Sequence, residues 1–217
     1  MASDKPVQAS AEGHVPIADC LRASPRLFDN WILDKLSRVH WSMPLCFYVP
    51  LVVFLAGLSF ETLDFVTICW TALSGYVVWT LTEYFGHRYL FHTEFPGTWG
   101  ARFHFLLHGV HHAHPSDPLR LVMPPLMSAP IMILAFLLMI VLVGRPLAYP
   151  VFMGFVIGYL IYDMVHYSLH HIEFKSRGGR NLRRLHMSHH FHDAERGFAI
   201  SAPWWDKIFG TAQSSAQ

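Results

Sequence analysis

Residues 104–114, HFLLHGVHHAH, carry five histidines in eleven positions. Three of these, His108, His111 and His112, stand at i, i+3 and i+4, so on a helix they project from one face and can converge on a common point. Convergent imidazoles are typical of a metal site. One or two such residues would also suit ordinary surface or core histidines, so the rest of the chain has to decide between the two interpretations.

Three further histidine clusters flank this stretch. They comprise His87 and His92, then His166, His170 and His171, and finally His186, His189, His190 and His192. Fourteen of the sixteen histidines therefore lie between positions 87 and 192. His14 and His40 lie outside this region, and we interpret both as incidental. The density of the remaining set predicts metal binding.

The composition of the 217-residue chain favours one domain, or at most two small ones, in a membrane setting. Its hydrophobic content is 53% and its charged content 14%, which departs from the soluble average in the membrane direction. The net charge of +1 gives no reason to expect a nucleic-acid partner. The three cysteines show no paired spacing, and we interpret them as packing residues.

Four apolar runs predict an all-α fold, an integral-membrane bundle of four transmembrane helices. The first run is roughly 25 Å long as a helix, which is marginal for a hydrocarbon core of about 30 Å. A Gly144–Arg145–Pro146 turn makes the third and fourth runs a hairpin. The alternative, a soluble bundle in which these runs are buried helices, stays open at this point. The runs cover about 44–60, 65–82, 126–143 and 147–165.

The second and fourth runs both end in histidines. Counted along a continuous helix, His87 lies about 33 Å beyond Phe65, and His166 lies about 29 Å beyond Leu147. Both should emerge at the edge of the hydrocarbon. With four crossings the two helices run in the same direction, so all histidine clusters are expected on one membrane surface.

The distribution of basic residues indicates which side of the membrane this surface faces. Of sixteen Lys and Arg residues, only Arg145 falls on the side opposite to the histidines. Because cytoplasmic loops are enriched in Lys and Arg, we expect both termini and a histidine-rich helical cap in the cytosol. The predicted organisation is a cytosolic or interfacial segment over 1–43, followed by a membrane domain over 44–217. Within the first segment, 28–36 fits an interfacial helix or an ordinary soluble cap equally well.

Neutral imidazole suits zinc, iron, copper or nickel, whereas magnesium and calcium require oxygen ligands. One ion cannot use ten histidines, but two ions with five each can, which suggests hydrolysis or oxygen activation. His87 and His92 lie about 140° apart on a regular helix, so they serve different ions unless the helix unwinds. No HExxH motif is present, which disfavours a membrane zinc protease. A membrane protein that binds or transports metal without redox turnover remains the alternative from another class.

Four segments carry a resemblance to a known family: EYFGHRYLFH, HFLLHGVHHAHPSDPLRLVMPP, YDMVHYSLHH and HMSHHF, within roughly 80–210. They closely resemble the fatty acid 2-hydroxylase branch of the fatty acid hydroxylase and sterol desaturase superfamily. The resemblance implies an O₂-dependent membrane hydroxylase that adds a hydroxyl at C2 of a fatty acyl chain, free or in a sphingolipid-like lipid. Sister branches imply oxidation or desaturation of sterols or carotenoids instead.

The same resemblance implies a dimetal centre, with two iron ions expected and zinc possible in purified samples. Ten histidines match the family's ligand positions: His87, His92, His108, His111, His112, His166, His170, His186, His189 and His190. His104, His114, His171 and His192 are expected to support or pack beside the site rather than ligate. We expect carboxylates to accept hydrogen bonds from the ligand imidazoles. The candidates are Glu83, Asp117, Asp163 and Asp193.

Related eukaryotic members often begin with a cytochrome b5 domain, and this N-terminal segment has no HPGG haem-binding motif. The resemblance therefore implies a separate electron donor, such as a cytochrome b5-like protein or a ferredoxin with its reductase. The expected location is the bacterial cytoplasmic membrane, or the endoplasmic reticulum in a eukaryote.

Overall fold

The computed structural model describes residues 17–213, and all regular structure in that range is helical. The all-α prediction is confirmed. The elements are α1 (Ile17–Arg22), α2 (Trp31–Leu36), α3 (Met43–Phe60), α4 (Phe65–Gly86), the π-helix η1 (His87–Phe91), α5 (Gly97–His104), the π-helix η2 (Phe105–Gly109), α6 (Val110–Ala113), α7 (Pro125–Val143), α8 (Ala148–His171), α9 (Arg177–Phe191) and α10 (Trp204–Ile208).

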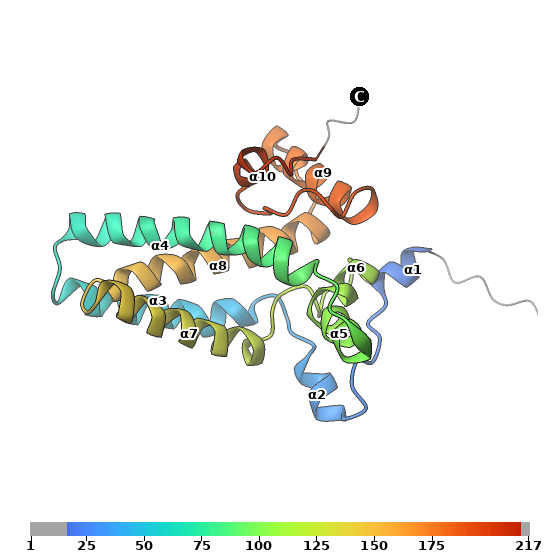
Figure 1. Ribbon diagram of the computed structural model, residues 1–217, viewed down its shortest axis with the longest axis horizontal. Helices are drawn as coiled ribbons and strands as arrows, with labels where there is room; N and C mark the ends of the chain where they lie inside the picture. The colour runs from blue at the N-terminus through green and yellow to red at the C-terminus, as the bar shows by residue number, and fades with distance from the viewer. Residues whose placement is uncertain (1–16, 214–217) are drawn as a thin grey trace, which may run out of the picture.

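Four long helices, α3, α4, α7 and α8, lie side by side and form the body of the molecule (Figure 1). Each is long and apolar enough to cross a membrane. The predicted run ending at 165 continues as helix to His171, and the one ending at 82 continues to Phe91, because hydropathy marks where apolar residues stop and not where the helix stops. The histidines at these ends are thus held on rigid helices.

Helix α8 is the centre of the bundle. About 67% of its most apolar window is buried, whereas the other three helices bury 17–22% of theirs. The outer helices leave large apolar side chains exposed, among them Val53, Trp70 and Leu134. A helix that is apolar all round but covered on one side only is expected to contact lipid on the other. The chain is therefore a multi-pass membrane protein.

Helices α4 and α8 approach each other at the backbone. A Cβ atom added at Gly75 would lie 1.8 Å from the carbonyl oxygen of Val151, and one added at Gly154 would lie 1.8 Å from that of Ala72. Small residues permit such close packing between membrane helices, where van der Waals contact is the main attraction. This contact fixes the position of α4, which leads into His87, relative to α8, which carries His166.

The two short turns of the bundle, at 61–64 and 144–147, lie at one end, and all histidine-bearing elements lie at the other (Figure 1). We call the region formed by 87–124 and 172–213 the cap. The prediction that the second and fourth runs deliver their histidines to the same end is confirmed, since His87, directly after α4, and His166, on α8, belong to two neighbouring histidine groups.

The N-terminal segment packs against the cap. The amide of Val39 donates to the carbonyl of Leu119 over 2.7 Å, and the amide of Ser116 donates to that of Leu21 over 3.0 Å. Helix α2 nevertheless leaves Trp31 and Ile32 exposed. The segment therefore combines features of both interpretations, a cap element with an apolar outer face.

Asp34 fastens this segment. Its carboxylate accepts hydrogen bonds from the amide of Leu27 over 2.7 Å and from the guanidinium groups of Arg38 and Arg120, each over 3.1 Å. Asp34→Ala is expected to speed amide hydrogen exchange across 25–38 about tenfold, because charged hydrogen bonds that hold the segment closed are lost. Exchange measured by mass spectrometry tests this. Asp29→Ala is the control, since the Asp29 side chain is exposed and makes no hydrogen bond within 17–213; equal exchange in both variants would contradict the prediction.

Candidate metal centre and its cavity

The structure sorts the ten predicted histidines into two groups of five. In each group the ligand atoms lie within 4.8 Å of one another. Group one contains His87, His92, His108, His112 and His189, and group two contains His111, His166, His170, His186 and His190. The groups are neighbours, since the ring centroids of His112 and His190 are 4.3 Å apart.

The i, i+3, i+4 triplets do not converge on one point, and this corrects the expectation for His108, His111 and His112. His108 and His112 belong to group one, whereas His111 belongs to group two. Around a helix, residue i+4 is rotated from residue i in one direction by about 40°, and residue i+3 is rotated in the opposite direction by about 60°. Helix α9 shows the same division, with His186 and His190 in group two and His189 in group one. Helices α6 and α9 therefore both run along the boundary between the two groups.

A π-helix resolves the position of His87 and His92. Between them η1 closes an i→i+5 hydrogen bond, from the amide of His92 to the carbonyl of His87, over 3.2 Å. The wider turn brings both imidazoles to the same side. Their Nε2 atoms are 3.1 Å apart. Of the two alternatives, the structure thus supports a distorted helix end and not two different ions.

The spacing of the Nε2 atoms fits metal ions. Adjacent Nε2 pairs in group one, such as His87 with His108 and His112 with His108, are 3.1 and 3.0 Å apart. In group two, His166 with His111 and His170 with His186 are 3.0 and 2.8 Å apart. Two ligands at a right angle on an ion with bonds of about 2.1 Å are about 3.0 Å apart. The spacing therefore suits imidazoles that share an ion.

Burial keeps these imidazoles neutral. It lowers the pKa of His92 to about 3 and that of His112 to about 3, and it holds the pKa of His108, His111 and His186 well below the usual value. Neighbouring imidazoles add to the effect, since a second positive charge in the cluster is repelled. Neutral imidazole is the form that binds metal. The residues present therefore suit borderline metals such as iron or zinc.

The predicted carboxylate partners of the ligands are wrong as a group, because none of Glu83, Asp117, Asp163 and Asp193 hydrogen bonds to one of the ten histidines. Backbone carbonyls take that role for two ligands: His87 Nδ1 donates to the carbonyl of Phe198 over 2.6 Å, and His189 Nδ1 to that of Arg196 over 2.8 Å. Sequence reasoning missed both partners. A carbonyl is present at every residue, so no sequence signal distinguishes these two.

The remaining histidines lie outside both groups. His114 is half-buried and its Nδ1 contacts the carbonyl oxygen of Cys20 at 2.8 Å, whereas the ring of His171 packs on Tyr167 with centroids 4.4 Å apart. His104 is half-buried and His192 is exposed. His40 contacts the Ser42 hydroxyl, and His14 lies outside the described residues.

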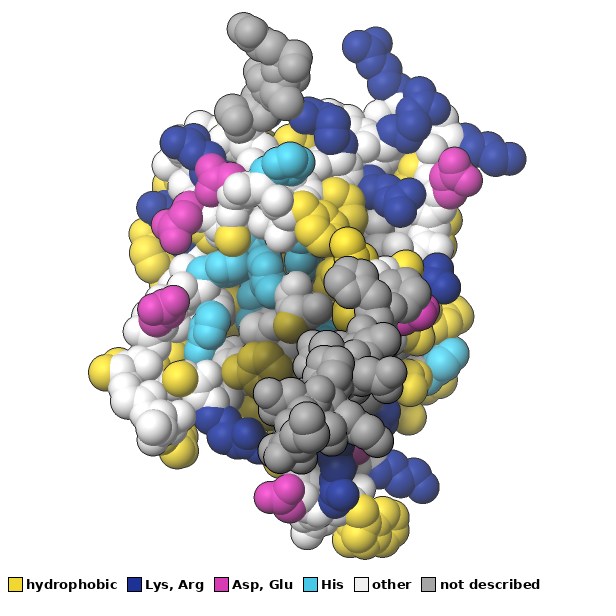
Figure 2. Space-filling model, turned by 90° about the vertical axis from the view of Figure 1, so that its right-hand side faces the viewer, with side chains coloured by type: hydrophobic (Ala, Val, Ile, Leu, Met, Phe, Trp, Pro, Cys, Tyr) yellow, Lys and Arg dark blue, Asp and Glu magenta, His cyan; other side chains and the backbone are white. Residues whose placement is uncertain are grey.

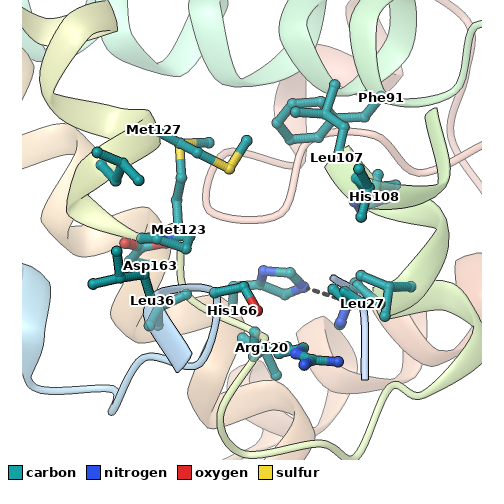
Figure 3. A pocket seen from close by; sticks show the side chains of 18 of the residues that line it. Leu27, Leu36, Phe91, Leu107, His108, Arg120, Met123, Met127, Asp163 and His166 are labelled. Atoms are coloured by element: carbon teal, nitrogen blue, oxygen red, sulfur yellow. Dashed lines mark hydrogen bonds between the residues drawn. The ribbon is translucent and has the colours of Figure 1, made fainter. Parts of the chain in front are cut away.

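An apolar cavity of about 170 Å³ reaches the two histidine groups (Figure 3). His108 of group one and His111 and His166 of group two form part of its wall. Figure 3 shows Met123 and Met127 facing Phe91 and Leu107 across the space, with Leu27 and Leu36 of the N-terminal segment along another side. Seen from the cap end, histidine side chains lie in a hollow beside apolar ones (Figure 2). The buried polar side chains of the cavity wall include Asp163 and Arg120.

Fold and site together define a multi-pass membrane protein with a histidine-lined centre able to hold metal ions beside an apolar cavity. The sequence model of the family described as fatty acid hydroxylase matches residues 72–211. The chain belongs to the fatty acid hydroxylase family.

Relatives extend the likeness over most of the chain. The dihydroceramide fatty acyl 2-hydroxylase FAH2 of Arabidopsis thaliana is 37% identical over 200 residues, covering 91% of this chain and 83% of that protein. The ceramide very long chain fatty acid hydroxylase SCS7 of Saccharomyces cerevisiae is 35% identical over 202 residues, covering 88% of this chain and 50% of that protein. A solved structure of full-length scs7p, with only the hydroxylase domain visible, matches with a TM-score of 0.83 at 34% identity, over 87% of this chain and 72% of that one.

Proposed function

We propose that this protein is an O₂-dependent membrane hydroxylase that adds a hydroxyl at C2 of a fatty acyl chain, free or within a sphingolipid-like lipid. The observation that carries the proposal is the apolar cavity whose wall includes histidines of both groups. A cavity of this kind accepts an alkyl chain and brings it against the site of oxidation. The names of the relatives, which are hydroxylases of fatty acyl chains and ceramides, support the choice of substrate.

The ten histidines would hold two iron ions, five ligands to each group. When bound, the pair supplies the reductive activation of O₂ needed to oxidise an unactivated C–H bond. In the overall reaction one oxygen atom enters the product, and the other leaves as water with two electrons and two protons from a donor.

The protein's own part is to place one carbon. Met123, Met127 and Leu107 line the cavity with apolar surface that excludes water and holds the chain by burial of its methylene groups. The carbon that reacts is then the one that the cavity's depth leaves beside His108, His111 and His166. Leu27 and Leu36 belong to the N-terminal segment, so we include residues 1–43 with the hydroxylase domain of 44–217 as a functional part of the enzyme.

We infer that the cap and both termini are cytosolic, supported by the excess of Lys and Arg at the histidine end. In that orientation a soluble or membrane-bound donor, such as a cytochrome b5-like protein or a ferredoxin with its reductase, reaches the metal centre from the cytosol. The membrane would be the bacterial cytoplasmic membrane or the endoplasmic reticulum.

Feeding ¹⁸O₂ to cells that express the protein tests the reaction. We expect ¹⁸O in the C2 hydroxyl of acyl chains released from lipids, and no label when ¹⁸O is supplied as water. A labelled sterol or carotenoid with unlabelled acyl chains would assign the protein to a sister branch instead. A change in metal tolerance that does not depend on oxygen, without any labelled lipid, would favour metal binding or transport.

Metal removal tests the cofactor separately. Dialysis of the purified protein against a strong chelator is expected to abolish hydroxylation, and Fe²⁺ is expected to restore it. Zn²⁺ should bind to the same histidines without restoring activity, because it has no accessible redox change. Activity restored equally by Zn²⁺ would contradict an iron centre.

A further inference from the structure

One loop, residues 196–201, orients two ligands of group one. The carbonyl oxygens of Arg196 and Phe198 accept hydrogen bonds from His189 Nδ1 and His87 Nδ1. Since a carbonyl can only accept, each Nδ1 carries the hydrogen, and each Nε2 presents its lone pair to the group. The Phe198 ring also packs on both imidazoles, with centroids 5.9 and 5.8 Å away. Both rings are therefore fixed in tautomer and direction before any ion arrives.

Two buried carboxylates hold this loop in place. Asp206 accepts the amides of Phe198 and Ala199 over 2.9 and 3.0 Å. Glu83, on α4, accepts the amides of Ile200 and Ser201 over 2.6 and 2.7 Å, and also the Ser201 hydroxyl. Four successive backbone N–H groups are thus donated to two carboxylates that are only 4% and 5% exposed.

The two buried carboxylates and the loop stabilise each other. A buried carboxylate is stable only when hydrogen bonds replace its water, and here neither carboxylate has a salt-bridge partner among residues 17–213. The loop therefore depends on the carboxylates, and they depend on the loop. Displacement of either would release the carbonyls that orient His87 and His189.

Group two lacks a comparable support. The Nδ1 atoms of His166, His186 and His190 are buried and have no hydrogen-bond partner in the described part of the chain. Partners of this kind direct the ring and raise ligand basicity, and their loss typically costs about 10–100-fold in metal affinity. The two groups offer the same number of imidazoles, but within 17–213 two of the five in group one are oriented through Nδ1 and none of the five in group two is.

We propose that the two metal sites are inequivalent: group one is a preorganised site that fills first and retains its ion, and group two is an exchangeable site that fills second. Glu83 and Asp206 are positioning residues that act on group one through the loop 196–201. The inference rests on the proposed dimetal centre, but it concerns metal binding and not turnover.

Metal release from the loaded protein tests the order. With Co²⁺ as the probe and a chromogenic chelator in excess, we expect two phases of equal amplitude whose rates differ by about 10–100-fold. Neighbouring residues on α9 assign the phases: His190→Ala should keep the slow ion, and His189→Ala should keep only a fast one. A single phase, or the opposite assignment, would overturn the proposal.

Variants of Glu83 and Asp206 test whether these two carboxylates slow the release of the ion from group one. Glu83→Gln and Asp206→Asn are each expected to speed the slow phase about 10–100-fold and to leave the fast phase unchanged. Glu173→Gln, on an exposed residue before α9, is the matched control. If Glu83→Gln does not fold, Ser201→Ala removes one donor to the same carboxylate and should show a smaller change in the same direction. An unchanged slow phase in folded Glu83→Gln and Asp206→Asn would overturn the assignment of Glu83 and Asp206 as positioning residues.

The outcomes separate this inference from the proposed function. Ordered binding of two ions without hydroxylation would contradict the proposed reaction and support the inequivalence. Two ions released at the same rate from an active hydroxylase would contradict only the inequivalence. A protein that binds no Co²⁺ would contradict both.

Discussion

Replacement of either His111 or His189 by alanine is expected to abolish hydroxylation. His111 belongs to group two and His189 to group one, so in the proposed dimetal centre each variant removes a ligand from a different ion. Loss of a residue that merely orients a ligand costs about 10–100-fold, so loss of the ligand itself should reduce activity more than about 100-fold. Mass spectrometry of released 2-hydroxy acyl chains measures the activity, and elemental analysis of the purified variants measures the bound metal, which should also fall.

His114→Ala and His192→Ala are the matched controls. His192 is exposed and His114 is half-buried, and both lie near the clusters in sequence but outside the two groups. We expect each control to keep its metal and most of its activity. Full activity in His111→Ala or His189→Ala, or loss of metal in both controls, would count against the division of the histidines described above.

The second large effect is expected at the contact between α4 and α8. In Gly154→Ala the new Cβ would lie 1.8 Å from the Ala72 carbonyl oxygen, which belongs to a backbone and cannot turn away. Overpacking usually costs about 1–3 kcal/mol, and a clash between two backbones should exceed that range. The expected fall in Tm is roughly 6–12 °C or more, measured by thermal unfolding of the protein in detergent. Metal content should fall with it, since η1, which continues α4, and α8 carry histidines of different groups.

Gly57→Ala distinguishes this clash from a general effect of alanine. Gly57 lies inside α3, and nothing lies within 4 Å of the position that its Cβ would take. Alanine is favoured over glycine inside a helix by about 1 kcal/mol. The Tm of Gly57→Ala should therefore equal that of the unsubstituted protein or be slightly higher. Equal destabilisation in Gly57→Ala and Gly154→Ala would show that the close approach of α4 and α8 is not the cause.

The long helices and the histidine set could be predicted because each depends on a local pattern. An apolar run indicates a membrane helix whatever surrounds it, and clustered histidines with i, i+3, i+4 triplets indicate metal wherever the helices lie. The choice of ten ligands among fourteen histidines came from the resemblance to the family. The common end of α4 and α8 followed from counting crossings. These inferences needed the order of residues and the rise of a helix, and no knowledge of contacts distant in the chain.

The division of the histidines could not be predicted in the same way. Spacing places His108, His111 and His112 on one face, but the direction in which the boundary between the groups crosses that face depends on how α6, α8 and α9 meet. The π-helix at His87 is likewise a response to a tertiary requirement, since its residues have no pattern that excludes an α-helix. Glu83 was expected to contact a histidine directly, and its true partner is a loop more than a hundred residues away.

The boundary helices α6 and α9 have a further consequence. His111 and His112 are consecutive residues that serve different groups, and so are His189 and His190. Consecutive Cα atoms are held about 3.8 Å apart by covalent geometry. Two such pairs, on different helices, would set the spacing between the two proposed ions. The cavity wall, in contrast, is built largely from residues outside these pairs, such as Met123, Met127 and Leu107. Substitutions there are expected to change the substrate while leaving the spacing of the proposed ions unaltered.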